Sequence, residues 1–81
     1  MRALLEYLAR SLVDEPDKVE VSGTETDSRV DLELRVAPDD MGRVIGRQGR
    51  TAAALRLLLA AAADLDGQRI QLDIRDPSGR R

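Results

Sequence analysis

Two segments of the chain alternate strictly between apolar and polar residues, and this alternation limits the possible folds. In residues 29–36 every second position is Val or Leu and the positions between are charged; residues 69–75 repeat the pattern with Ile and Leu. A period of two places one set of side chains on each face of a strand. A shorter version, with Val19 and Val21, covers residues 18–21. We therefore predict three strands, each with one apolar face that other elements must cover.

The remaining segments have helical spacing. Residues 2–13 carry leucines three and four positions apart, and we predict that Pro16 ends this helix because proline cannot continue the hydrogen-bond pattern. The segment 38–45 opens with Pro-Asp-Asp, which is typical of a helix start, and predicts a short helix. Residues 51–65 are dense in Ala and Leu and predict a longer helix that Gly67 ends.

The order of these segments predicts an α+β fold. The polar segment 22–28 is a short connection that suits an antiparallel hairpin between the first two strands. The 32 residues of 37–68 form a helical crossover, which permits the third strand to lie parallel to the second. We predict a two-layer sandwich with a three-stranded mixed sheet, three helices on one face and solvent on the other. Residues 1–76 are predicted to form a single domain, and 77–81 a flexible tail.

Composition excludes several classes of function. The chain has 81 residues with no Cys and no His, which excludes disulfides, thiolate or imidazole metal sites and Cys or His nucleophiles. Tyr7 is its one aromatic residue, which argues against modules that stack bases on aromatic rings. The longest uncharged apolar run, 57–63, is too short to span a bilayer, and there is no apolar segment at the N-terminus. We expect a soluble, cytoplasmic, non-catalytic protein without a cofactor, a metal or a membrane span.

Charge is segregated along the chain although the formal net charge is only −2. Residues 14–40 hold ten acidic and three basic residues, whereas residues 41–63 hold four arginines and no acidic residue. A basic block inside an acidic protein predicts a local anion-binding site.

This basic block contains a Gly-x-x-Gly sequence between the two central helices. Gly46 and Gly49 allow a turn with positive φ and a close approach of another backbone. The second glycine leads into a helix N-terminus, whose free N–H groups attract anions. Arg47, Gln48 and Arg50 add two guanidinium groups and an amide at this point. The combination favours a sugar-phosphate backbone as the ligand.

The segment Met41-Gly42-Arg43-Val44-Ile45-Gly46-Arg47-Gln48-Gly49-Arg50-Thr51-Ala52-Ala53-Ala54-Leu55-Arg56 resembles the signature of the KhpA (YlqC-like) family of small, stand-alone bacterial KH-domain proteins. The resemblance extends over essentially the whole chain and implies the type II KH-like order α-β-β-α-α-β. It also implies that the Gly-x-x-Gly loop clamps single-stranded RNA beside a four-nucleotide groove. The candidate RNA-binding residues are Gly46, Arg47, Gln48, Gly49, Arg50, Arg43, Val44 and Ile45. Arg47 departs from the family in replacing a common Lys, which keeps the charge.

The resemblance further implies partners and roles. It implies a homodimer, or a heterodimer with a larger KhpB (Jag/EloR)-like KH protein, and a role as an RNA chaperone or post-transcriptional regulator. The third helix fits such an interface. We predict that its core stripe consists of Leu55, Leu58, Leu59 and Ala62. The helix has more leucines than one narrow stripe can hold, so some of them should be exposed.

Two other functions remain open at this point. The two helices around Gly46–Gly49 could form a DNA-binding helix-turn-helix, but residues 51–63 offer only Arg56 to read base edges. Alternatively, the chain is a protein-interaction scaffold in which Gly-x-x-Gly is only a structural turn. The paired carboxylates Asp39-Asp40 and Asp64/Asp66 are interpreted as a helix cap and a solvated helix end rather than as a metal or acid/base site.

Overall fold

The computed structural model describes residues 1–76, so the predicted tail, 77–81, lies outside the described residues. The helices and strands are α1 (Arg2–Leu12), β1 (Glu20–Glu25), β2 (Arg29–Arg35), α2 (Met41–Ile45), α3 (Arg50–Leu65) and β3 (Arg69–Arg75). Short 3-10 turns precede β1 (Pro16–Lys18), α2 (Pro38–Asp40) and α3 (Arg47–Gly49). The predicted order α-β-β-α-α-β is therefore confirmed.

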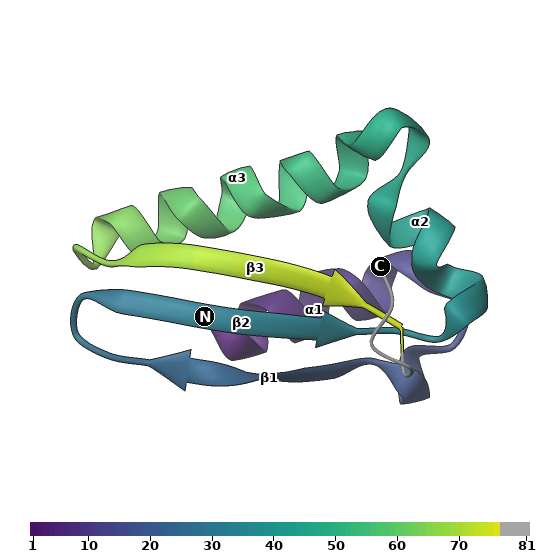
Figure 1. The fold of residues 1–81 in the computed structure, drawn as a ribbon, viewed down its shortest axis with the longest axis horizontal. Helices are drawn as coiled ribbons and strands as arrows, with labels where there is room; N and C mark the ends of the chain where they lie inside the picture. The colour runs from purple at the N-terminus through teal and green to yellow at the C-terminus, as the bar shows by residue number, and fades with distance from the viewer. Residues whose placement is uncertain (77–81) are drawn as a thin grey trace.

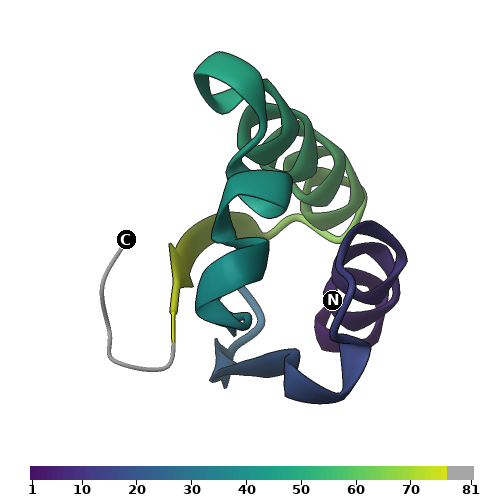
Figure 2. The same ribbon diagram turned by 90° about the vertical axis from the view of Figure 1, so that its right-hand side faces the viewer.

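The sheet has the order β1-β2-β3, with β1 antiparallel and β3 parallel to the central strand β2. Seen end-on, α1 and α3 lie on one side of the sheet, and α2 lies across one end of the molecule (Figure 2). In Figure 1, α3 runs along β3, and α2 joins the end of β2 to the start of α3. The mixed α+β architecture expected from the alternating segments is confirmed.

The core lies between the sheet and the helices, as the alternation requires. The side chains of β2 alternate between buried and partly exposed positions along the strand. Thirteen buried residues form one cluster: Leu5, Ala9, Val19, Val30, Leu32, Leu34, Val36, Val44, Ala52, Leu55, Leu59, Leu72 and Ile74. This cluster fixes α3 against β3 and so fixes the loop at the start of α3.

The first hairpin differs from the prediction. Residues 22–25 belong to β1 rather than to a connection, and they pair with β2 as far as Glu25 opposite Val30. The sequence did not show this because β1 is an edge strand with exposed side chains, so apolar alternation is not required there. Gly23 lies inside the strand, where a Cβ atom would overlap the carbonyl of Asp31.

The first helix and the third helix also differ from prediction in detail. The helix α1 ends at Leu12, and Pro16 starts a separate 3-10 turn instead of ending the helix. In α3 the buried residues are Ala52, Leu55, Leu59 and Ala63, so Leu58 does not belong to the core stripe. Gly67, with φ +72°, follows the end of α3 as predicted.

Candidate nucleic-acid interface

The Gly46–Gly49 loop turns sharply between α2 and α3. Three of its four residues have positive φ: Gly46 (+76°), Gln48 (+56°) and Gly49 (+74°). A Cβ atom on Gly46 would overlap the side chain of Thr51, so packing alone requires glycine there. Gly49 has no neighbouring atom within 4 Å of the position a Cβ would occupy. The turn is therefore closed on one side and leaves open space above its second glycine.

The side chains of this loop are exposed and carry positive charge that no carboxylate of residues 1–76 neutralises. Arg47 and Gln48 are exposed, and Arg50 donates a hydrogen bond to Gln48 Oε1 at 3.3 Å. Within residues 1–76, neither Arg47 nor Arg50 forms an ion pair. Gly49 is the N-cap of α3 and no side chain caps its first N–H groups. Free N–H groups, the positive end of a 16-residue helix and two arginines make this point suited to an anion.

The structure places Arg43 differently from the rest of the predicted site. Its Nη2 lies 2.7 Å from Asp14 Oδ2, and its Nε lies 3.4 Å from Asp40 Oδ1. Two carboxylates therefore pair with this guanidinium, and 54% of the Arg43 side-chain surface remains exposed. The sequence could not predict the ion pair with Asp14, because Asp14 precedes Arg43 by more than two dozen residues.

Asp40 is buried, with 1% of its surface exposed, and does not cap α2. Instead, its two carboxylate oxygens accept hydrogen bonds from the backbone N–H groups of Asp14 and Glu15, each at 3.1 Å. The interpretation of Asp40 as a side-chain cap of the helix is therefore wrong. The carboxylate ties the segment after α1 to the start of α2, and thus fixes the helix that carries the loop.

Of the two apolar candidates, the structure places Val44 in the core. Val44 is 0% exposed, so its side chain anchors α2 to the core and cannot touch a ligand in this conformation. Ile45 is partly buried and packs against the core from its edge. Ile45 is thus the apolar member of the predicted site that a ligand can contact.

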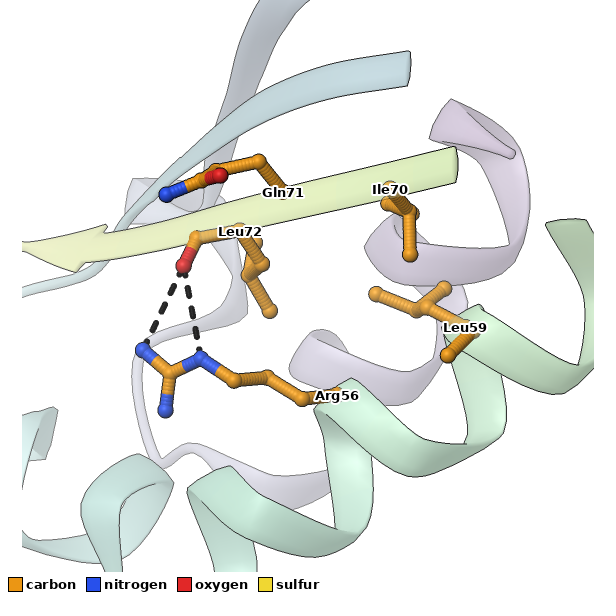
Figure 3. Close-up of a pocket in the computed structure, with 6 residues that line it drawn as sticks. Arg56, Leu59, Ile70, Gln71 and Leu72 are labelled. Atoms are coloured by element: carbon orange, nitrogen blue, oxygen red, sulfur yellow. Dashed lines mark hydrogen bonds between the residues drawn. The ribbon is translucent and has the colours of Figure 1, made fainter. Parts of the chain in front are cut away.

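A hollow of about 230 Å³ lies between α3 and β3, and sequence reasoning did not identify it. It is lined by Arg56, Leu59, Ala60, Ile70, Gln71 and Leu72. In Figure 3, Arg56 reaches from α3 to the backbone of β3, while Ile70 and Leu72 point toward α3. Arg56 donates from Nε and Nη2 to the carbonyl oxygen of Leu72, at 3.4 and 3.3 Å. The lining side chains come from a helix and the strand that follows it, and they meet only because α3 packs on β3, so no local pattern could have indicated this hollow.

The described residues show neither a group of three or more potential metal ligands nor a helix long and apolar enough to cross a membrane.

Two helices joined by a Gly-x-x-Gly loop and packed on a three-stranded sheet define a KH domain. The family model for the KhpA/KhpB KH domain matches residues 2–74, and the chain belongs to this family. An RNA-binding protein KhpA of Halalkalibacterium halodurans is 51% identical over 94% of this chain and 100% of its own length. Similar proteins of the same name occur in Clostridium acetobutylicum (50% identical; 91% of this chain, 99% of the relative) and Aquifex aeolicus (45% identical; 91% and 94%). The relatives are named as RNA-binding proteins, and the family is not one of enzymes.

Proposed function

We propose that this chain binds single-stranded RNA without catalysing a reaction, and that the Gly46–Gly49 loop holds the sugar-phosphate backbone. The observation that carries the proposal is the pair of unneutralised arginines, Arg47 and Arg50, on a positive-φ turn at the start of α3. The names of the relatives support RNA as the ligand. In this proposal, Gly49 lets the backbone approach closely and Gln48 supplies hydrogen bonds.

The hollow between α3 and β3 supports a single strand as the ligand rather than a duplex. Its walls combine aliphatic side chains with the guanidinium of Arg56 and the outer edge of β3. Unstacked bases can pack on aliphatic walls and present their edges to such groups, whereas the bases of a duplex are not accessible in this way. Arg43 is left out of the proposed interface because Asp14 and Asp40 hold it.

Salt titration of RNA affinity tests this proposal against a scaffold in which the loop is only a turn. If two to three phosphates are contacted, the logarithm of affinity for a short single strand should fall with the logarithm of salt at a slope of about −1.5 to −2. A scaffold would show no RNA affinity at any salt concentration. A slope steeper than about −4 would require a larger basic surface than this one and would contradict the proposed site.

We also propose that the chain pairs with a second KH protein, either another copy or a KhpB-like partner. The support comes from an apolar hollow of about 220 Å³ between α1 and α3, lined by Leu8, Ser11, Leu12, Thr51, Ala54, Leu55 and Leu58. Leu58, which lines this hollow, is 55% exposed, as expected if α3 carries more leucines than the core can bury. Exposed apolar area of this kind is typical of an interface. Pairing two weak RNA sites would raise avidity in a cytoplasmic RNA chaperone or post-transcriptional regulator.

Sedimentation at tens of micromolar checks the pairing. If the partner is another copy, the unmodified chain should sediment as a dimer, and Leu58→Glu should shift it to the monomer because a charge would enter the apolar hollow. Leu65→Glu is the matched control, since Leu65 is an exposed leucine of the same helix outside that hollow. A chain that sediments as a monomer and recovers no KH partner from cell extract would contradict this proposal.

A further inference from the structure

Of the arginines in residues 1–76 that no carboxylate pairs with, all but Arg2 belong to the loop, α3 or β3. Most basic side chains of residues 1–76 pair with a carboxylate; these are Arg10, Lys18, Arg29, Arg35, Arg43 and Arg75. The basic side chains of the same part of the chain without such a partner are Arg2, Arg47, Arg50, Arg56 and Arg69. Of these, Arg2 binds the carbonyl of Gly23 on β1, and the other four belong to the loop, α3 and the first residue of β3.

The hollow beside Arg56 continues beyond the proposed site. A second hollow of about 530 Å³ adjoins it and shares Ala60 and Ile70 with it. Its other lining residues are Leu57, Ala61, Asp64, Gln68 and Arg69. The groove therefore runs along α3 from Arg56 toward the helix C-terminus, and α3 spans roughly 21 Å between Arg50 and Asp64.

Hydrogen bonds tie the far end of this groove to the β1–β2 hairpin. Gln68 donates hydrogen bonds to the carbonyl of Thr26 at 2.7 Å and to Glu25 Oε2 at 3.2 Å. The next N–H, that of Arg69, donates to the carbonyl of Ser28 at 2.9 Å. These bonds fix the start of β3 to the tip of the β1–β2 hairpin. Arg69 is exposed and has no carboxylate within ion-pair distance in residues 1–76.

We propose that bound RNA continues past the four nucleotides at the loop, along α3 and β3, and that Arg69 binds a phosphate at the far end. This inference rests on the proposed RNA-binding function and extends its site. Leu57, Ala60 and Ile70 supply an apolar floor for an additional base, and Asp64 offers an acceptor to the exocyclic amino group of that base. The charge pattern favours RNA over a protein segment as the occupant, because the groove links arginines that the fold leaves unpaired.

Binding of tetranucleotides and heptanucleotides of each of the four bases tests the extension. Seven nucleotides cannot hold two separate four-nucleotide sites, but such a site can take about four positions on a heptanucleotide, so a fourfold gain is purely statistical. We expect the unmodified chain to gain about tenfold, because one further exposed charge pair contributes roughly threefold. Arg69→Ala should keep only the statistical gain. The salt slope of the unmodified chain should be steeper by about 0.7 for the heptanucleotide, and Arg69→Ala should remove this difference.

Arg29→Ala is the matched control, because Arg29 lies beside Arg69 in the sheet register but is paired with Asp31 at 2.7 Å. The hydrogen bond from Arg29 also lowers the pKa of the Asp31 carboxyl. Arg29→Ala should bind both RNAs like the unmodified chain. A gain of only fourfold in the unmodified chain, or an equal loss in both variants, would overturn the extension. Absence of tetranucleotide binding would instead overturn the proposed function itself.

Discussion

Asp40→Asn should lower the free energy of unfolding by about 2–4 kcal/mol, although the two side chains have the same shape. Both carboxylate oxygens of Asp40 accept backbone N–H groups, from Asp14 and Glu15, and Arg43 pairs with one of them. An asparagine amide has only one oxygen, so its NH₂ group would face a backbone N–H, and the ion pair with Arg43 would be lost. The change therefore leaves polar groups unpaired at a site that is almost fully buried.

Urea unfolding followed by circular dichroism measures this effect. Asp39→Asn is the matched control. Asp39 is the exposed neighbour of Asp40, and this substitution changes the net charge by the same amount. The control should lie within about 0.5 kcal/mol of the unmodified chain. If Asp40→Asn were as stable as the control, the contact between Asp40 and the segment after α1 would not contribute to stability as we infer.

The sheet topology and the loop could be predicted because their signals are local. Strict alternation over 29–36 and 69–75 specifies strands with one buried face, and the long helical segment between them permits the parallel crossover that the structure has. The Gly-x-x-Gly turn is likewise specified by four consecutive residues, and the positive φ values of Gly46 and Gly49 explain why glycine occurs at both positions. These features depend on neighbours in sequence rather than on the tertiary structure.

The remaining features of the site depend on contacts between distant residues. Arg43 has the same charge and a similar sequence position to Arg47, yet Asp14 and Asp40 neutralise the first and leave the second free. Leu58 and Leu59 are adjacent leucines, but only Leu59 faces the core. The helical spacing of the leucines could not show which of the two is buried, because the packing of α3 on β3 fixes the orientation of the helix.

The groove along α3 and β3 illustrates the same limit. Arg56 gains its position from a hydrogen bond to the carbonyl of Leu72, sixteen residues away. Strand β1 was predicted too short for a related reason. As an edge strand it exposes most of its side chains, so its extent is set by pairing with β2 and not by hydrophobic alternation.

Replacing both Arg47 and Gln48 with Asp should abolish detectable RNA binding and leave the fold intact. Both side chains are exposed and outside the core, so their replacement removes no buried contact. The change removes a cation and an amide from the proposed backbone clamp and adds two negative charges that repel phosphate. Loss of two contacts worth about 1 kcal/mol each already predicts at least thirtyfold weaker binding, before repulsion is counted.

A matched control separates a local effect from a change in net charge. Ala3→Asp combined with Arg10→Asp makes the same change in net charge on exposed positions of α1, away from the loop. This control should bind RNA nearly as the unmodified chain does. Circular dichroism of all three proteins should show the same helix content.

The most direct test of RNA binding through the Gly46–Gly49 loop is therefore the affinity of these three proteins for one labelled single-stranded RNA at low salt. We predict that the unmodified chain and the α1 control bind with affinities within about threefold of each other, while the folded loop variant shows no measurable binding. A folded loop variant that binds within about twofold of the unmodified chain would contradict the account.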